Sequence, residues 1–212
     1  IAVGIFDHGK EYFLSYGLPF EGKKVHADEN TIYELASITK MFVATIFSDL
    51  LLKKKLNLDD SIITYLPDTL KFVDQNFSNI TLRQLAIHTS GLPDNFGDQK
   101  KFDYWEYLKD LTYDKLFLNL ESLKLNNVSE KKFRYSNFNY ALLSYVICKV
   151  ENKNLEELFS KYYYEPFEMK NTALKLNKKQ ENLFATPYLR PGAITDYWDL
   201  ANSSCAGAAG LK

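Results

Sequence analysis

Residues 34–52 read ELASITKMFVATIFSDLLL, a run that has the length of a helix and contains neither glycine nor proline. After Ser37 the run is apolar except for two threonines, Lys40, one serine and one aspartate. A helix that is apolar nearly all round is typical of a protein interior. The sequence therefore predicts a central, buried helix over residues 35–55, whose last three residues are lysines that suit a helix C-terminus.

Ser37 and Lys40 are three residues apart, which places both side chains on one face of the first turn of this helix. An ammonium group is costly to bury without a partner, and both desolvation and the helix dipole lower the pKa of a lysine at such a position. A neutral amine beside a hydroxyl is a base beside a nucleophile. The pair therefore predicts a nucleophilic serine with Lys40 as its activating base.

The Ser-x-x-Lys pattern is short, and average composition gives on the order of one chance match in a chain of this length. A second match runs from Ser129 to Lys132, in a charged stretch where a lysine stays solvated and protonated. The context favours the first match, because only Ser37 opens an apolar helix. The pattern and its context leave a structural role for Ser37 as open as a catalytic one.

The composition of the 212 residues, 46% apolar and 25% charged, is that of an ordinary soluble globular protein. The net charge of −1 indicates no surface for nucleic acid or for an anionic membrane. The histidines, His8, His26 and His88, are far apart and lack ligand spacing, so no zinc site is expected. Two cysteines do not make a disulfide framework. No signal peptide and no apolar run long enough to span a bilayer is visible.

The remaining sequence predicts several short elements. Strand-forming runs at residues 1–6 and 12–16 flank turn residues and indicate a hairpin. Helices are expected over residues 81–87, 103–118, 138–150 and 155–164, and a short strand over residues 171–176. The small, glycine-rich residues 201–210 are typical of a tight loop beside a site.

The segment His88-Thr-Ser-Gly-Leu-Pro93 follows the helix at residues 81–87 and is expected to be a turn. Gly91 can adopt a positive φ, and Pro93 prevents the helix from continuing. Buried polar groups in turns are usually satisfied by local partners. We therefore expect His88 to hydrogen-bond backbone groups, with a catalytic role as the less favoured alternative.

Tyr135-Ser-Asn137 precedes the apolar helix at residues 138–150. Side chains two residues apart in an extended segment point the same way. The tyrosine could relay a proton, and the asparagine amide could hold a polar arm of a substrate. The structural alternative is an aromatic core residue followed by a helix cap.

Four segments, taken in their order and spacing, resemble the serine β-lactamase-related family of class C β-lactamases, penicillin-binding DD-peptidases and their esterase relatives. They are SITK (37–40), LAIHTSGLP (85–93), YSNFNYALL (135–143) and AGAAGL (206–211). The resemblance implies an α+β fold of the β-lactamase/transpeptidase type, an antiparallel sheet flanked by helices next to a mostly helical subdomain. The chain is then one serine hydrolase domain, with the hairpin of the α/β part in residues 1–31 and the mostly helical part in residues 32–212.

The resemblance also implies a role for each candidate site residue. Ser37 would be the acylated nucleophile, and its backbone N–H would be half of the oxyanion hole. Lys40 would activate Ser37. Tyr135 would pass the proton to the leaving group and later help to activate the deacylating water. Asn137 would bind the amide of the substrate's acyl side chain, and no metal or cofactor is implied.

The implied substrates are small molecules or peptides: β-lactams, D-Ala-D-Ala-type peptides, or related esters and amides. Relatives act on such substrates outside the cytoplasm, so we expect a periplasmic, membrane-anchored or secreted protein. The family also carries a third motif, Lys/His-x-Gly, on a strand near its C-terminus, and this sequence has none. We therefore expect a truncated chain without the later sheet strands. The alternative is a catalytically silent penicillin-binding-like interaction or sensor domain.

Overall fold

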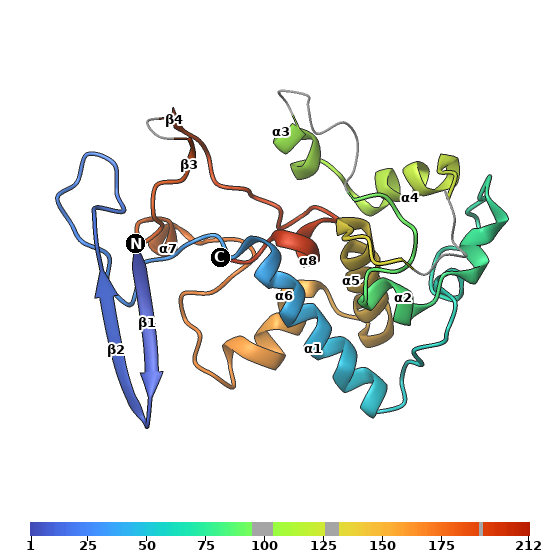
Figure 1. The fold of residues 1–212 in the computed structure, drawn as a ribbon, viewed down its shortest axis with the longest axis horizontal. Coiled ribbons are helices and arrows are strands. Elements are labelled where there is room, and N and C mark those ends of the chain that lie inside the picture. The colour runs from blue at the N-terminus through green and yellow to red at the C-terminus, as the bar shows by residue number, and fades with distance from the viewer. Residues whose placement is uncertain (95–103, 126–131, 191–192) are drawn as a thin grey trace.

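The computed structural model describes residues 1–94, 104–125, 132–190 and 193–212. Its elements, in chain order, are β1 (Ala2–Asp7), β2 (Lys10–Ser15), η1 (Ala36–Ile38), α1 (Thr39–Leu52), η2 (Ile62–Thr64), η3 (Gln75–Asn79), α2 (Leu82–Ala86), α3 (Tyr104–Lys109), α4 (Tyr113–Ser122), α5 (Asn137–Glu151), α6 (Leu155–Phe159), η5 (Ser160–Tyr164), α7 (Lys178–Glu181), β3 (Tyr188–Arg190), β4 (Ala193–Ile194) and α8 (Ala206–Ala209). The β1–β2 hairpin stands at one end of a body made mostly of helices (Figure 1).

The hydrophobic core lies in the helical body, where one cluster of buried apolar side chains joins α1, α2, α4, α5, α6 and α8. Helix α5 is its centre, because it packs against α1, α2 and α8. Most residues of the first three turns of α5 are buried, so the helix meets neighbours on nearly every side. Burial of this apolar surface supplies the main driving force for folding of the body.

Helix α1 differs from its prediction at both ends and on one face. It begins at Thr39, because Ser37 belongs to a separate 3₁₀ turn, η1, and it ends at Leu52. One face carries the buried residues, but Met41 is 68% exposed and Leu52 is 83% exposed. The prediction of a helix buried all round is therefore wrong, because α1 buries one face in the core and leaves other apolar side chains at the surface.

Among the other predicted elements, the hairpin and the helices that became α2, α5 and α6 with η5 are confirmed within a few residues. The single helix expected over residues 103–118 is wrong, and its first residue lies outside the described ones. Two helices replace it, since the Thr112 hydroxyl accepts the backbone N–H of Lys115 and caps α4. No strand forms over residues 171–176 within the described chain; Ala173 instead exchanges two backbone hydrogen bonds with Lys212.

The hairpin turns at His8-Gly9, where both residues have positive φ, 47° and 79°. Two positive φ values match the two-residue turns that suit the twist of a hairpin. Every residue of β1 and β2 is exposed. Among the residues that the structure describes, these two strands pair only with each other, and β3 and β4 form a separate two-stranded sheet.

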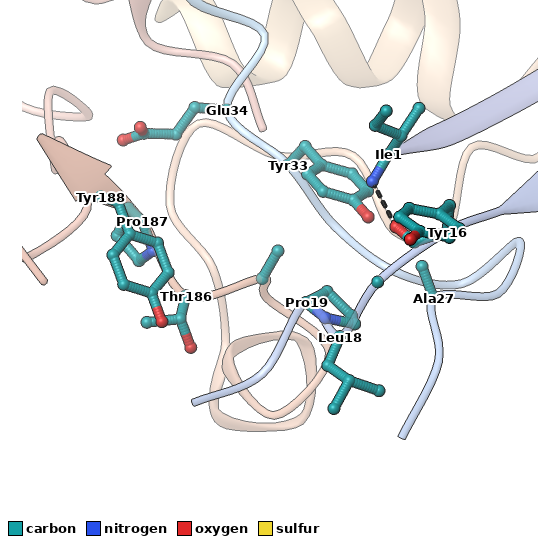
Figure 2. Close-up of a pocket in the computed structure, with 12 residues that line it drawn as sticks. Ile1, Tyr16, Leu18, Pro19, Ala27, Tyr33, Glu34, Thr186, Pro187 and Tyr188 are labelled. Atoms are coloured by element: carbon teal, nitrogen blue, oxygen red, sulfur yellow. Dashed lines mark hydrogen bonds between the residues drawn. The ribbon is translucent and has the colours of Figure 1, made fainter. Parts of the chain in front are cut away.

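A cavity of about 410 Å³ separates the base of the hairpin from the body. Figure 2 shows Tyr16 and Tyr33 on one side of this cavity and residues 186–188 on the other. The two sides are joined by the backbone N–H of Thr186, which donates to the carbonyl of Pro19 at 2.8 Å. The backbone N–H of Glu21 also donates to Thr186 Oγ1 at 2.9 Å, so the segment after β2 contacts the body beside this cavity.

Candidate active site

The hydroxyl of Ser37 is presented at the surface by the η1 turn, directly before α1. Ala36, the residue before it, has a φ of 45°. This is the left-handed region, which is unfavourable for a residue with a Cβ, and strained backbone of this kind clusters at functional sites. The turn leaves Ser37 exposed, although the helix that follows is anchored in the core.

Lys40 is buried, with 6% of its surface exposed. Its Nζ donates to Asn137 Oδ1 and to the Ala208 carbonyl, both at 2.7 Å, and lies 3.2 Å from Ser37 Oγ. The amine therefore has polar partners from α5, from α8 and from the turn that carries the serine. A buried amine held in this way is a fixed hydrogen-bonding centre beside a nucleophile.

Burial lowers the pKa of the Lys40 amine, and the hydrogen-bonding and charge interactions of the Tyr135 phenol oppose this shift. The direction agrees with the expectation drawn from an apolar helix. A lowered pKa makes the neutral amine more available near neutral pH, which a general base requires.

Tyr135 reaches the same point from the extended segment before α5. Its hydroxyl donates to Ser37 Oγ at 2.8 Å, and Lys40 Nζ lies 4.9 Å from the centroid of its ring. A second hydrogen bond holds this segment in place, because the buried Ser136 hydroxyl donates to the carbonyl of Pro93 at 2.6 Å. The structure thus brings together all four predicted residues, Ser37, Lys40, Tyr135 and Asn137.

Helix α8 supplies a contact that sequence reasoning missed. Within the stretch 201–210 that was expected to be a tight loop, residues 206–209 form this short helix instead, and it packs closely against α5. A Cβ on Gly207 would lie 1.6 Å from Ser144 Oγ, so only glycine allows this approach. The approach brings the Ala208 carbonyl to Lys40. The small residues were a signal for close packing, but they did not indicate the partner.

His88 is a second residue that lies against the site. Its Nδ1 accepts the backbone N–H of Ser136 at 3.1 Å, which agrees with the expected hydrogen bond to backbone. Its ring also stacks on Tyr135, with centroids 4.6 Å apart and planes 28° from parallel. The sequence indicated the first contact but not the second, because the two residues belong to segments distant in the chain.

In the described ranges, no three His, Cys, Asp or Glu side chains gather closely enough to hold a metal ion. None of the helices described there is long and apolar enough to cross a membrane. The polar centre around Ser37 consists of a hydroxyl, an amine, a phenol and an amide. These groups can support attack by an alcohol and transfer of its proton.

A family model described as "Beta-lactamase" matches residues 1–212. The chain belongs to the β-lactamase family. Curated relatives include Protein flp of Staphylococcus aureus (strain MW2), 30% identical over 174 residues, which cover 81% of this chain and 34% of that protein. The Beta-lactamase of Providencia stuartii is 28% identical over 194 residues, 89% of this chain and 46% of that protein. The chain thus spans between a third and a half of these β-lactamase-family relatives.

Solved structures share the fold. A β-lactamase/D-alanine carboxypeptidase from Yersinia pestis, complexed with citrate, superposes with a TM-score of 0.81 at 24% identity, covering 99% of this chain and 58% of that one. A class C β-lactamase gives 0.80 at 24% identity, covering 99% and 55%. The predicted β-lactamase/transpeptidase-like fold is therefore confirmed. At 24% identity, these two structures show a shared fold.

Proposed function

We propose that Ser37 is the nucleophile of a serine hydrolase that forms an acyl-enzyme with β-lactams, D-Ala-D-Ala-type peptides or related esters and amides. The observation that carries the proposal is the position of Ser37 Oγ, 3.2 Å from the amine of Lys40 and 2.8 Å from the hydroxyl of Tyr135. A nucleophile within reach of a base, which other groups orient in turn, is the arrangement that nucleophilic catalysis needs.

The partners of Lys40 support its role as the base. A neutral amine has two N–H groups and one lone pair. The two contacts at 2.7 Å, to Asn137 Oδ1 and the Ala208 carbonyl, use both N–H groups. The lone pair is then left for the hydroxyl proton of Ser37. After this proton has moved, the third N–H of the ammonium faces the serine oxygen, so both protonation states are satisfied.

The reaction begins when Ser37 Oγ attacks the substrate carbonyl and its proton passes to Lys40. The tetrahedral intermediate collapses, the bond to the leaving group breaks, and Tyr135 donates the proton that this group needs. Lys40 reprotonates Tyr135 in turn. Water then attacks the acyl ester, and Tyr135 takes a proton from the water as it passes its own proton to the neutral amine of Lys40. The new tetrahedral intermediate collapses, the bond to Ser37 Oγ breaks and releases the acid, and Ser37 Oγ takes the proton back from Lys40. The short distance from the phenol to Ser37 Oγ supports this relay.

Asn137 has a contact that the prediction of a substrate-binding residue did not include. Its Oδ1 accepts from Lys40, so it orients the base as well. Binding of a substrate amide by Asn137 remains part of the proposal. The whole protein is proposed to act outside the cytoplasm, as a periplasmic, membrane-anchored or secreted enzyme, because the proposed substrates belong there.

A second candidate is a domain that binds such ligands without turnover. For the 212-residue chain taken by itself, a site that lacks one oxyanion donor is slower by about 10²–10³-fold. The two candidates differ in whether Ser37 forms a covalent bond.

The deciding experiment is the intact mass of the protein after incubation with a fluorescent penicillin. We expect an adduct on the parent and none on Ser37→Ala, while Ser48→Ala, an exposed serine on α1, keeps the adduct. Destruction of the penicillin without an adduct, if lost in Ser37→Ala, would mean the same nucleophile with fast deacylation. Neither adduct nor destruction would refute the proposal for this chain and favour the binding domain.

A further inference from the structure

His88 contacts the ring of Tyr135 and the backbone of the two residues on either side of Tyr135. Its ring stacks on the phenol ring at 4.6 Å. Its carbonyl accepts the backbone N–H of Arg134 at 2.8 Å, and its Nδ1 accepts the backbone N–H of Ser136 at 3.1 Å. One residue thus holds the residue before Tyr135, the residue after it and the phenol ring itself.

The hydrogen bond from the backbone N–H of Ser136 defines the protonation state of the His88 imidazole. Because Nδ1 accepts a hydrogen bond, it carries no proton, so the ring is neutral with its proton on Nε2. The Nδ2 of Asn139 also lies 3.2 Å from Nδ1, while Asn139 Oδ1 accepts from the Ser90 hydroxyl at 2.6 Å. This buried network fixes the plane of the His88 ring.

The aromatic surroundings restrict the ring further. His88 is 9% exposed and lies against Tyr140, with ring centroids 5.3 Å apart. Tyr135, in contrast, is 40% exposed, so little else in its position is fixed by burial. A buried ring that is held by its neighbours can set the orientation of a partly exposed ring that stacks on it.

We propose that His88 is a positioning residue for Tyr135, a neutral imidazole that fixes the segment around the phenol and the plane of its ring so that the hydroxyl meets Ser37 Oγ. This inference rests on the proposed function, because it concerns how the proton relay is oriented. It differs from a local turn role, since a turn residue would hold its own loop and leave the hydroxyl of Tyr135 unaffected.

The backbone of His88 suggests two matched variants. Its φ is 58°, and asparagine is among the residues that best tolerate this left-handed region. His88→Asn keeps an acceptor near the position of Nδ1 but removes the ring. His88→Phe keeps a ring but removes the acceptor. His26→Asn, in an exposed loop, is the control for the same substitution.

The test is a double-mutant cycle on the acylation rate with fluorescent penicillin. We expect each His88 variant to slow acylation by about 10- to 100-fold, because misplacing a catalytic group by 1 Å has effects of this size. In a Tyr135→Phe background the same His88 variants should have little further effect, because the hydroxyl they position is gone. Equal fold-losses in both backgrounds, or losses no larger than that of His26→Asn, would overturn the proposal.

A second readout separates this proposal from the proposed function, because it needs no acylation. With tyrosine labelled by ¹³C at Cζ, the Tyr135 resonance is assigned from its loss in Tyr135→Phe. We expect it to shift in both His88 variants and to stay in place in His26→Asn. If the His88 variants do not fold, ¹⁵N spectra of the histidines in the parent protein test the proposal, because they show which ring nitrogen of His88 carries the proton. A His88 ring protonated at Nδ1, or an unmoved Tyr135 resonance, contradicts the proposal even if the protein is not acylated.

Discussion

The helical body buries its apolar side chains, whereas the hairpin exposes them. In α5, Leu143 and Ile147 are completely buried. In the hairpin, Ile5, Phe6 and Leu14 are 45%, 74% and 58% exposed. The two regions are joined near the cavity shown in Figure 2. The body therefore has a core of its own, and the hairpin does not share it.

This difference separates the candidate site from the hairpin. Ser37, Lys40, Tyr135 and Asn137 all belong to the body, and their hydrogen bonds in the described residues connect η1, α1, α5 and α8. A lone two-stranded hairpin is marginally stable, and exposed apolar patches mark surfaces that are covered by a partner. We therefore infer that the body determines the geometry of the site.

The largest expected effect is on catalysis within the body. Lys40→Met keeps the length of the side chain and removes the base, so acylation by fluorescent penicillin should fall by about 10²–10⁴-fold. Lys53→Met, at the exposed end of α1, is the control and should acylate at the parental rate. Parental acylation in Lys40→Met would show that another group takes the proton of Ser37.

The pH dependence of the same pair tests the protonation state. Burial lowers the pKa of Lys40 below the ordinary value of 10.5. Between the two values the unfolded chain holds a proton that the folded chain has lost, so the free energy of unfolding rises with pH in this window. Acylation should rise at the lower edge of this window, around the folded-state pKa of Lys40, because the free amine forms there. In Lys40→Met, both the free energy of unfolding and the acylation rate should depend less steeply on pH. An unchanged pH dependence would show that another group causes it.

The next largest effect is on stability. Leu143→Ala removes a side chain that is 0% exposed, and large-to-small substitutions of this kind cost about 2–5 kcal/mol. Urea denaturation followed by circular dichroism measures the loss. A cost near zero would mean that α5 is not the packed centre of the body.

What the sequence predicted at the site was local. The spacing of Ser37 and Lys40, and that of Tyr135 and Asn137, follows from the geometry of a single segment, so each pair could be recognised. The contact between Lys40 and the Ala208 carbonyl joins residues 168 positions apart, and no pattern in the sequence indicates it. The stack of His88 on Tyr135 was missed for the same reason.

The fold shows the same contrast between local features, which the sequence predicts, and tertiary contacts, which it does not. A strong local signal, such as the turn residues of the hairpin, was enough to predict its element. The exposure of Met41 and Leu52 was not predictable, because an apolar residue does not reveal whether a neighbour covers it. Which face of α1 meets the core is decided by α5 and α8, whose positions are a tertiary property.

A smaller loss of stability is expected at the contact between α8 and α5. Gly207→Ala places a Cβ against Ser144, and overpacking of this kind costs about 1–3 kcal/mol. Ser144→Gly should restore part of the loss in the double variant. Gly4→Ala in β1, where a Cβ meets nothing within 4 Å, is the control in the hairpin. Equal costs for the two glycines would remove the distinction between a packed body and an open hairpin.

The smallest effect is expected in the hairpin itself. Leu14 is 58% exposed, and surface substitutions of this kind usually change stability by no more than about 0.5 kcal/mol. Leu14→Ala should therefore leave the urea midpoint of the 212-residue chain nearly unchanged, in contrast to the identical substitution at Leu143. A loss above about 1 kcal/mol that grows with protein concentration would show that a second copy covers the hairpin in solution. A large loss independent of concentration would mean that the hairpin packs against its own body, because burial is what makes truncation of a leucine costly.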